Sequence, residues 1–361
     1  MKRRDVLAGA GALAVAGCAN QAEDCGPAGA AERLRWKMVT TWPPNFPGLG
    51  TGAANLAKFI ERASGGRLSV KVYAGGELVP PLEVFDTVSS GTAEIGHGAA
   101  YYWKNKSPAT QFFTAIPFGI NAQEMKGWLY YGGGLELYRE VYDRFGLVPF
   151  PAGNTGVQMG GWFNREINSL ADLAGLKMRI PGLGGEVLRR AGGTPVNLPG
   201  AEIFTALQTG TIDATEWVGP YNDIAFGLHK AAKYYYYPGW QEPGPVLECI
   251  VNKAAFENLP DDLQAIVEIA CSAVNDQMEA EFTARNATAL QQLRGDDNIE
   301  IRPFPDDVLR ELRGLADEVI ADMAAEDPLV ARVAESFIAY RDSVRDWTSI
   351  SEHAMLNTRT L

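Results

Sequence analysis

The sequence contains few of the residue types on which most enzyme active sites depend. Only three histidines occur in 361 residues, and none belongs to the HExxH arrangement of zinc hydrolases. No GxSxG nucleophile turn, Walker phosphate loop or GxGxxG directly after a strand is present. Gly182–Gly185 follows a predicted strand, but Pro181 intervenes and no acidic residue ends a following strand at the distance that dinucleotide binding needs. These absences argue against the common enzyme classes.

Cysteine is also scarce, with four residues at positions 18, 25, 249 and 271. Their number and spacing fit neither a zinc site nor a dense disulfide framework. Cys249 lies in an apolar, strand-like run and Cys271 lies on the apolar face of a predicted helix. We therefore predict that these two are buried free thiols.

Positive charge is in deficit: the chain has 32 lysines and arginines but 44 aspartates and glutamates, which gives a net charge of −12. Without residues 1–17, which carry a net charge of +2, the chain has a net charge of −14. Such a chain does not hold nucleic acid through phosphate contacts, and anionic lipid repels it. We expect no nucleic-acid partner, and any membrane attachment would have to be covalent.

No run approaches the ~20 apolar residues of a transmembrane helix. Residues 1–17 join a basic start to a short apolar stretch, which predicts an export signal and a periplasmic location. The twin Arg3-Arg4 favours the twin-arginine route. Val15–Cys18 resembles a lipoprotein processing box, so either Cys18 carries a lipid anchor or it is removed by cleavage a few residues later. Residues 18–33 are polar and Ala/Gly-rich, which is typical of a flexible tether.

The rest of the chain alternates strands with helices, as in Leu34–Val39, Gly50–Ser64 and Leu68–Tyr73. This order predicts an α/β fold whose ligands bind at the carboxyl ends of the strands. About 330 residues exceed one hydrophobic core, so two lobes are expected. A long helix over Asp261–Arg294 would brace both lobes, and further amphipathic helices follow over 305–325 and 328–347.

Two segments repeat one pattern of helix, glycine and short strand: Val84–Ile95 and Ile203–Ala214. Two related lobes that share a cleft explain the similarity, and so does chance. In this alignment His97 corresponds to Glu216, so His97 either faces the cleft or is a buried histidine with satisfied hydrogen bonds. Arg179 ends the predicted strand Leu176–Ile180, where its planar fork suits a carboxylate, although a surface salt bridge is the alternative.

The segment Gly175–Gly182, with Leu198–Pro220, resembles the solute-binding proteins of TRAP (tripartite ATP-independent periplasmic) transporters. The resemblance extends over about Leu34–Trp347. Within it, Asp213–Pro220 is similar to the branch that binds 2-oxo and 2-hydroxy monocarboxylates with a metal ion.

This resemblance implies a two-lobed periplasmic-binding-protein fold, type II-like. Lobe I would comprise 34–154 plus about 245–290, and lobe II would comprise 155–244 plus about 291–361 with the C-terminal helices. It also implies membrane subunits of a TRAP transporter as partners. A homodimer through Leu329–Trp347 is a further expectation, with the apolar anchors Phe337, Ile338, Tyr340 and Trp347, and packing of these residues on the chain's own lobe is the alternative.

The resemblance further implies that Arg179 grips the substrate carboxylate. The side chains of Gln158 and Glu216, with the backbone oxygen of Trp217, would hold the cation. Further expected ligand-side or supporting residues are Tyr101, Tyr102, Asn154, Trp240, Asn222 and Asp223.

The charges and ligand types agree with this assignment. A substrate carboxylate beside Glu216 places two negative charges against Arg179 alone, so a monovalent cation brings the set to zero. Amide, carboxylate and carbonyl oxygens are hard ligands that suit Na⁺ or Ca²⁺. A 2-oxo or 2-hydroxy acid adds two chelating oxygens, as pyruvate or lactate would.

Three other functions remain open from the sequence. The first is a binding protein for another carboxylate, such as a sugar acid. The second is a metal-dependent lyase or hydrolase of small acids, and the third is a sensor module that delivers its ligand to a membrane receptor.

Overall fold

The computed structural model describes residues 33–359 and Leu361. The predicted export signal, the tether up to residue 32, Cys18 and Cys25 therefore lie outside the described residues. Among the described helices, none has the length and apolar character needed to cross a membrane.

The first of two sheets has the strand order β2-β1-β3-β10-β4. β1 is parallel to β2 and β3, whereas β10 runs antiparallel to both of its neighbours. The strands span β1 Leu34–Thr40, β2 Leu68–Tyr73, β3 Ile95–Gly98, β4 Leu147–Asn154 and β10 Val246–Asn252.

The second sheet has the order β11-β9-β5-β8-β6-β7, with β5 antiparallel to β8 and β9. The chain passes from the first sheet to the second through residues 155–160 and returns through 238–245. The strands span β5 Gly161–Phe163, β6 Lys177–Arg179, β7 Thr194–Val196, β8 Ala214–Thr215, β9 Tyr234–Tyr237 and β11 Glu300–Pro303.

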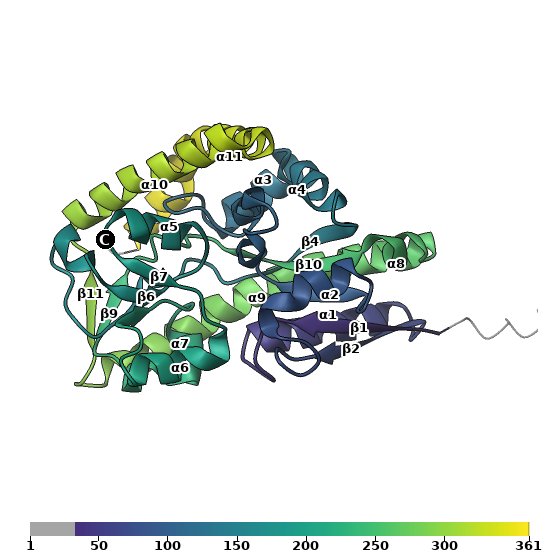
Figure 1. The fold of residues 1–361 in the computed structure, drawn as a ribbon, viewed down its shortest axis with the longest axis horizontal. Coiled ribbons are helices and arrows are strands. Elements are labelled where there is room, and N and C mark those ends of the chain that lie inside the picture. Colours follow the sequence, from purple (N-terminus) through teal and green to yellow (C-terminus); the bar gives the residue numbers. More distant parts are fainter. Residues whose placement is uncertain (1–32, 360) are drawn as a thin grey trace, which may run out of the picture. The chain divides into compact units, whose positions relative to one another are not determined.

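Helices surround both sheets (Figure 1). On the first-sheet side are α1 Leu49–Ala63, α2 Val84–Ser89, α3 Ala122–Tyr131, α4 Gly134–Asp143 and α8 Lys253–Glu257. On the second-sheet side are α5 Gly182–Arg190, α6 Gly200–Gln208 and α7 Pro220–Phe226. The C-terminal helices are α10 Asp306–Glu326, α11 Pro328–Thr348 and α12 Ala354–Thr358. α10 packs on α5, whereas α11 reaches α3 and α4.

Helix α9 spans Asp261–Arg294, the bounds that the sequence predicts. At 1.5 Å per residue its 34 residues extend for about 50 Å. It packs on α1 and β4 beside the first sheet and on α7 beside the second. α9 therefore braces both sheets, and the predicted two-part α/β architecture is confirmed.

The predicted internal repeat is present in the structure. α2 and α6 are each followed by a glycine in the left-handed region, Gly91 with φ 75° and Gly210 with φ 72°, and then by a short strand. β3 and β8 each lie parallel to a neighbouring strand. Cys249 and Cys271 are buried free thiols, as predicted.

His97 follows the repeat in the first sheet, and it is a fully buried histidine with satisfied hydrogen bonds. Its Nδ1 accepts a hydrogen bond of 2.7 Å from Trp42 Nε1. Because Nδ1 accepts, Nε2 carries the proton and donates to the Ala152 carbonyl oxygen at 3.0 Å. Burial lowers the pKa of His97 to about 4, so the ring is neutral at physiological pH.

We predict that His97 makes the fold acid-sensitive. The unfolded chain binds a proton here below pH ~6.5, whereas the folded chain resists protonation until about pH 4. Stability is thus fully present above pH ~6.5 and falls as the pH drops, by about 3 kcal/mol at pH 4. Urea unfolding of the wild type and His97→Gln across this range measures the difference. Parallel pH curves for the two proteins would contradict the assignment.

Candidate functional site

Four buried polar side chains meet where two strands end and the two sheets are joined. Arg179 is the last residue of β6 and Glu216 directly follows β8. β6 and β8 are parallel neighbours with Arg179 opposite Thr215, so their carboxyl ends lie at one edge of the sheet. Gln158 and Glu242 come from the segments that connect the two sheets.

Arg179 is the best-connected residue of this site, with an exposed fraction of 1%. Its Nη1 forms an ion pair with Glu216 Oε1 and donates to the Glu216 backbone oxygen at 3.4 Å. Nη2 donates to the Tyr102 hydroxyl and Nε to the Leu198 backbone oxygen, both at 3.3 Å. The guanidinium lies 5.0 Å from the centre of the Trp217 ring. The surface salt bridge that the sequence left open is excluded.

Gln158 and Glu242 form a second pair beside this one. Gln158 Nε2 donates to Glu242 Oε2 at 2.9 Å and to Thr155 Oγ1 at 3.2 Å. Their backbones also pair, with Gln158 N 3.2 Å from the Glu242 carbonyl oxygen. Glu242 was not predicted from the sequence. The available signal was a lone acidic residue in the Pro/Gly-rich segment 238–245, two residues after Trp240.

Two buried oxygens of the site accept no hydrogen bond from the described part of the chain: Gln158 Oε1 and Glu216 Oε2. Leaving such an atom unsatisfied costs about 1–3 kcal/mol. An amide oxygen and a carboxylate oxygen are ligands that hard cations prefer. The residues present therefore fit a Na⁺ or Ca²⁺ ion, and the Glu242 carboxyl group lies beside Gln158.

Burial and mutual repulsion shape the ionisation of the site. Burial raises the pKa of Glu216 to about 7 although Arg179 opposes the shift, and Asp223 adds to it. Burial also raises the pKa of Glu242 well above its usual range, and the Glu216 carboxylate raises it further. Burial disfavours the charge on Arg179, but Glu216 and the two tyrosines outweigh it and raise its pKa. Glu216 thus forms the ion pair with Arg179, while Glu242 lies close enough for the guanidinium charge to act on it.

Both predicted tyrosines reach the site from the other sheet. They lie in the short 3-10 helix η2 (Ala100–Trp103), with their ring centres 4.8 Å apart and nearly perpendicular. The Tyr102 hydroxyl accepts a hydrogen bond from Arg179. Burial raises the pKa of Tyr101, and the nearby Glu242 carboxylate raises it further. A Cβ on Gly182, the first residue of α5, would lie 3.1 Å from Tyr101 Cβ. The two halves of the molecule are therefore in close contact here.

The remaining predicted residues lie around the cluster. Trp217 packs edge-on against Trp42 and Phe46. Asn154 binds backbone groups of the connecting segments, accepting from Gly156 N and donating to the Gly244 carbonyl oxygen. Trp240 stacks on Phe118, and Asn222 donates to the Pro47 carbonyl oxygen.

Asp223 supports the turn that follows Glu216. Its Oδ1 accepts from the backbone nitrogens of Val218 and Gly219 at 3.3 and 3.2 Å. Its Oδ2 accepts from Trp162 Nε1 at 3.0 Å and from the Tyr235 hydroxyl at 2.7 Å. Asp223 thereby ties the turn carrying Trp217 to β5 and β9.

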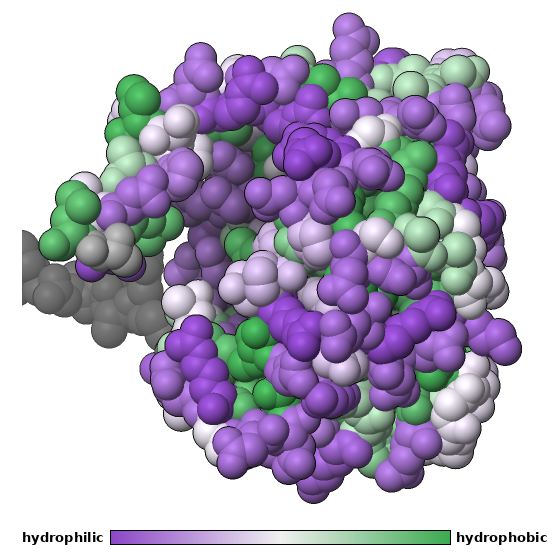
Figure 2. Space-filling model, turned by 90° about the vertical axis from the view of Figure 1, so that its left-hand side faces the viewer, coloured by the Kyte–Doolittle hydropathy of each residue, from purple (hydrophilic) through white to green (hydrophobic). Residues whose placement is uncertain are grey.

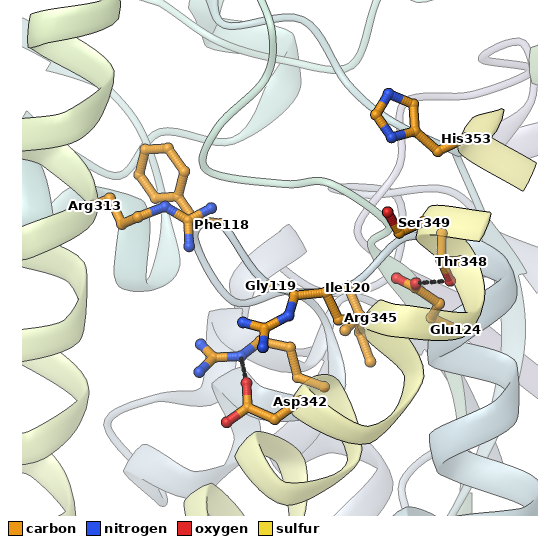
Figure 3. Close-up of a pocket in the computed structure, with 11 residues that line it drawn as sticks. Phe118, Gly119, Ile120, Glu124, Arg313, Asp342, Arg345, Thr348, Ser349 and His353 are labelled. Atoms are coloured by element: carbon orange, nitrogen blue, oxygen red, sulfur yellow. Dashed lines mark hydrogen bonds and ion pairs between the residues drawn. The ribbon is translucent and has the colours of Figure 1, made fainter. Parts of the chain in front are cut away.

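The pocket drawn in Figure 3 is separate from this site. A pocket of about 380 Å³ lies between α10, α11 and the loop at Phe118, with Arg313 and Arg345 in its wall (Figure 3). No predicted site residue lines it. A small cavity of about 70 Å³ touches Tyr101 and Gly182 and has Lys104 and Arg189 in its wall. Cationic side chains therefore border this small cavity beside Tyr101.

Comparison with known proteins supports the same conclusion as the geometry. Residues 38–327 match the family model described as bacterial extracellular solute-binding protein, family 7. A monocarboxylate 2-oxoacid-binding periplasmic protein of Nostoc sp. is 43% identical over 356 residues, which cover 98% of this chain and 97% of the relative.

Solved structures show the same fold. A TRAP periplasmic solute-binding protein of Pseudoalteromonas atlantica with bound sodium and pyruvate is 46% identical, with a TM-score of 0.88 over 90% of this chain and 99% of that one. One from Colwellia psychrerythraea with calcium and pyruvate is 45% identical, with a TM-score of 0.88 over 91% and 100%. One from Bordetella bronchiseptica, a mixed-occupancy dimer with calcium and picolinate, is 36% identical, with a TM-score of 0.89 over 91% and 98%.

These matches extend over nearly the whole chain and confirm both the predicted fold and the predicted resemblance. They also confirm the interpretation as a solute-binding component of a transport system rather than an enzyme. The chain belongs to family 7 of the bacterial extracellular solute-binding proteins, and within it to the TRAP transporter group.

Proposed function

We propose that this protein captures a small 2-oxo or 2-hydroxy monocarboxylate, of the pyruvate or lactate type, in the periplasm for the membrane subunits of a TRAP transporter. The observation that carries the proposal is a buried arginine beside two unsatisfied hard oxygens, Gln158 Oε1 and Glu216 Oε2. The pyruvate, sodium and calcium in its solved relatives support the same ligand chemistry.

Arg179 would grip the ligand carboxylate. Its guanidinium is held in place by Tyr102 and the Leu198 carbonyl oxygen, so little side-chain freedom is lost on binding. A planar guanidinium matches a carboxylate with two parallel hydrogen bonds, and burial strengthens the attraction. Tyr101 and Tyr102 would form the wall on the first-sheet side.

Gln158, Glu216 and the Trp217 backbone oxygen would hold the cation, and Glu242 is a further ligand candidate. When bound, the cation supplies positive charge beside the ligand's 2-oxygen. Asp223 would keep the turn with Glu216 and Trp217 in position through its backbone contacts.

Glu242 changes the charge balance that the sequence suggests. With Arg179, Glu216 and a substrate carboxylate, a monovalent ion gives zero net charge. An ionised Glu242 adds one negative charge, and a divalent ion then gives zero. We therefore propose Ca²⁺ for this chain when Glu242 is ionised, with Na⁺ as the alternative when it is protonated.

One other assignment remains as an alternative: a binding protein for another carboxylate, such as a sugar acid. Titration calorimetry with a panel of small acids distinguishes the two. Stoichiometric binding of pyruvate supports the proposal, whereas tighter binding of a sugar acid supports the alternative.

We also propose the two lobes implied by the resemblance, with boundaries near residues 154, 245 and 290. The segments joining the sheets, 155–160 and 238–245, are the candidate hinges, and α11 reaches back to α3 and α4 of the first-sheet side. Export by the twin-arginine route and the lipid anchor at Cys18 belong to this proposal as well. Mass spectrometry of the N-terminal peptide distinguishes lipidation from cleavage beyond Cys18.

A homodimer is a further proposal, through a surface that keeps Trp347 of the expected anchors and extends toward the C-terminus. Phe337 is buried at 1% exposure against this chain's own Trp128, and Tyr340 packs over Gly127 and Gly132. The exposed apolar side chains lie further along the chain. They are Trp347, Ile350, Met355 and Leu356, exposed by 65, 75, 60 and 51%.

Figure 2 shows the C-terminal segment projecting from the body at the left of the view, with hydrophobic residues on its surface. We expect a second copy to cover this surface, giving about twice the chain mass by light scattering at micromolar concentration. Ile350→Glu with Leu356→Glu should yield the monomer, because two charges would be buried unpaired. Ile269→Glu, at a 67% exposed site on α9, is the matched control. A monomeric wild type would rule the dimer out.

The central prediction is that cation and substrate bind as one unit. Glu216→Gln removes the charge that attracts the cation, so both cation affinity and pyruvate affinity should fall at least tenfold. By linkage, pyruvate should raise cation affinity by the same factor by which the cation raises pyruvate affinity. Propionate, which lacks the 2-oxygen, should bind far more weakly than pyruvate when cation is present.

Calorimetric titrations in cation-stripped and cation-loaded buffer measure these affinities. Glu202→Gln, an exposed carboxylate on α6, is the control and should behave as wild type. Equal pyruvate affinity with and without cation would exclude the bridging role.

Glu242→Gln should change which cation is preferred. The amide keeps an oxygen for the ion but removes one negative charge, so Ca²⁺ affinity should fall at least tenfold relative to Na⁺. Competition titration of the two ions in the presence of pyruvate measures this ratio. An unchanged ratio would show that the Glu242 charge is not part of the cation balance.

A further inference from the structure

A further buried carboxylate, outside the proposed ligand site, lies on β10. Glu248 is completely buried and accepts three hydrogen bonds from side chains. Its Oε1 accepts from Trp103 Nε1. Its Oε2 accepts from the hydroxyls of Tyr138 and Tyr142, the latter at 2.9 Å. The donors come from η2 on one side and from α4 on the other.

Burying the Glu248 carboxylate in the core costs free energy, because the charged group loses its contact with water. The described contacts of Glu248 are two hydroxyls and an indole, so no cation offsets its charge. Burial raises the pKa of Glu248 to about 7, although the three donors oppose the shift. An apolar side chain of similar volume would avoid the desolvation cost, so stability alone does not account for a carboxylate here.

Trp103 connects this carboxylate to the ligand site. It is the last residue of η2, and its ring lies edge-on to Tyr102 with the ring centres 6.0 Å apart. The Tyr102 hydroxyl in turn accepts from Arg179. Gly98 leaves room for the indole, because a Cβ there would lie 3.3 Å from Trp103 Cζ2. The indole is thus held by its N–H at one end and by packing along its ring.

We propose that Glu248 is a positioning residue for ligand capture. By fixing Trp103 it holds η2 in the orientation in which Tyr101 and Tyr102 meet Arg179 across the two sheets. Glu248 does not touch the ligand, and its effect on affinity rests on the function proposed above. Pre-ordering η2 lowers the entropy lost on binding.

Two substitutions break the connection at different ends. Glu248→Leu removes the acceptor, and Trp103→Phe removes the donor while keeping an aromatic ring. Each should weaken pyruvate binding about tenfold in saturating Ca²⁺. Ca²⁺ affinity without pyruvate should remain as in wild type, because Gln158, Glu216 and Glu242 are untouched. The double variant should be no weaker than either single one, because both remove one interaction.

Two variants serve as controls. Glu248→Gln keeps an oxygen toward Trp103 while its amide can donate to the tyrosine hydroxyls, so pyruvate affinity should stay within about twofold of wild type. Tyr142→Phe removes one donor from Oε2 without touching Trp103. It should lower the unfolding midpoint but leave pyruvate affinity unchanged.

Hydrogen exchange in the ligand-free protein supplies a readout that is independent of pyruvate. The backbone amides of 100–103 should exchange faster in Glu248→Leu and Trp103→Phe than in wild type or Tyr142→Phe. Unchanged exchange there, or binding losses that multiply in the double variant, would overturn the positioning role. If Glu248→Leu does not fold, Trp103→Phe decides. A wild type that binds no small acid would refute the proposed function alone, and the exchange result would still test the role of Glu248.

Discussion

The buried ion pair between Arg179 and Glu216 is the constraint on which the rest of the site depends. Both side chains are withdrawn from water, at 1% and 0% exposure. Removing one partner of such a pair leaves an uncompensated charge that costs about 3–5 kcal/mol. The fold meets this constraint by ending β6 and β8 side by side, so that the two charges face each other at one sheet edge.

The pair also explains why cation and anion binding should be linked. In the described structure, Oε1 of Glu216 pairs with Arg179, whereas Oε2 accepts no hydrogen bond. A carboxylate ligand competes with Glu216 for the guanidinium, and a cation offers Glu216 another partner. Each therefore makes room for the other, while burial and the Glu216 charge disfavour ionisation of the neighbouring Glu242.

Local sequence patterns predicted what depends on local structure. The bounds of α9 follow from a continuous apolar stripe with acidic residues at its start, and Arg179 could be placed because a strand visibly ends there. Glu242 escaped prediction because its partner Gln158 lies 84 residues away, and only the pairing of the two connecting segments joins them. Phe337 could not be assigned to a dimer surface or to the core for the same reason: an apolar helix face does not reveal whether its own chain covers it.

The two halves of the repeat show why similar local structure need not give similar function. His97 and Glu216 follow equivalent helix–glycine–strand units, yet both ring nitrogens of His97 are satisfied within the protein. Glu216 instead retains a buried oxygen without a hydrogen-bond partner among the described residues. In the proposed function, the first sheet would supply an aromatic wall positioned by Trp103 and Glu248, and the second would supply Arg179 and Glu216. Chemistry at this site comes from the atoms that the fold leaves unsatisfied, and only the second half of the repeat leaves one at this position.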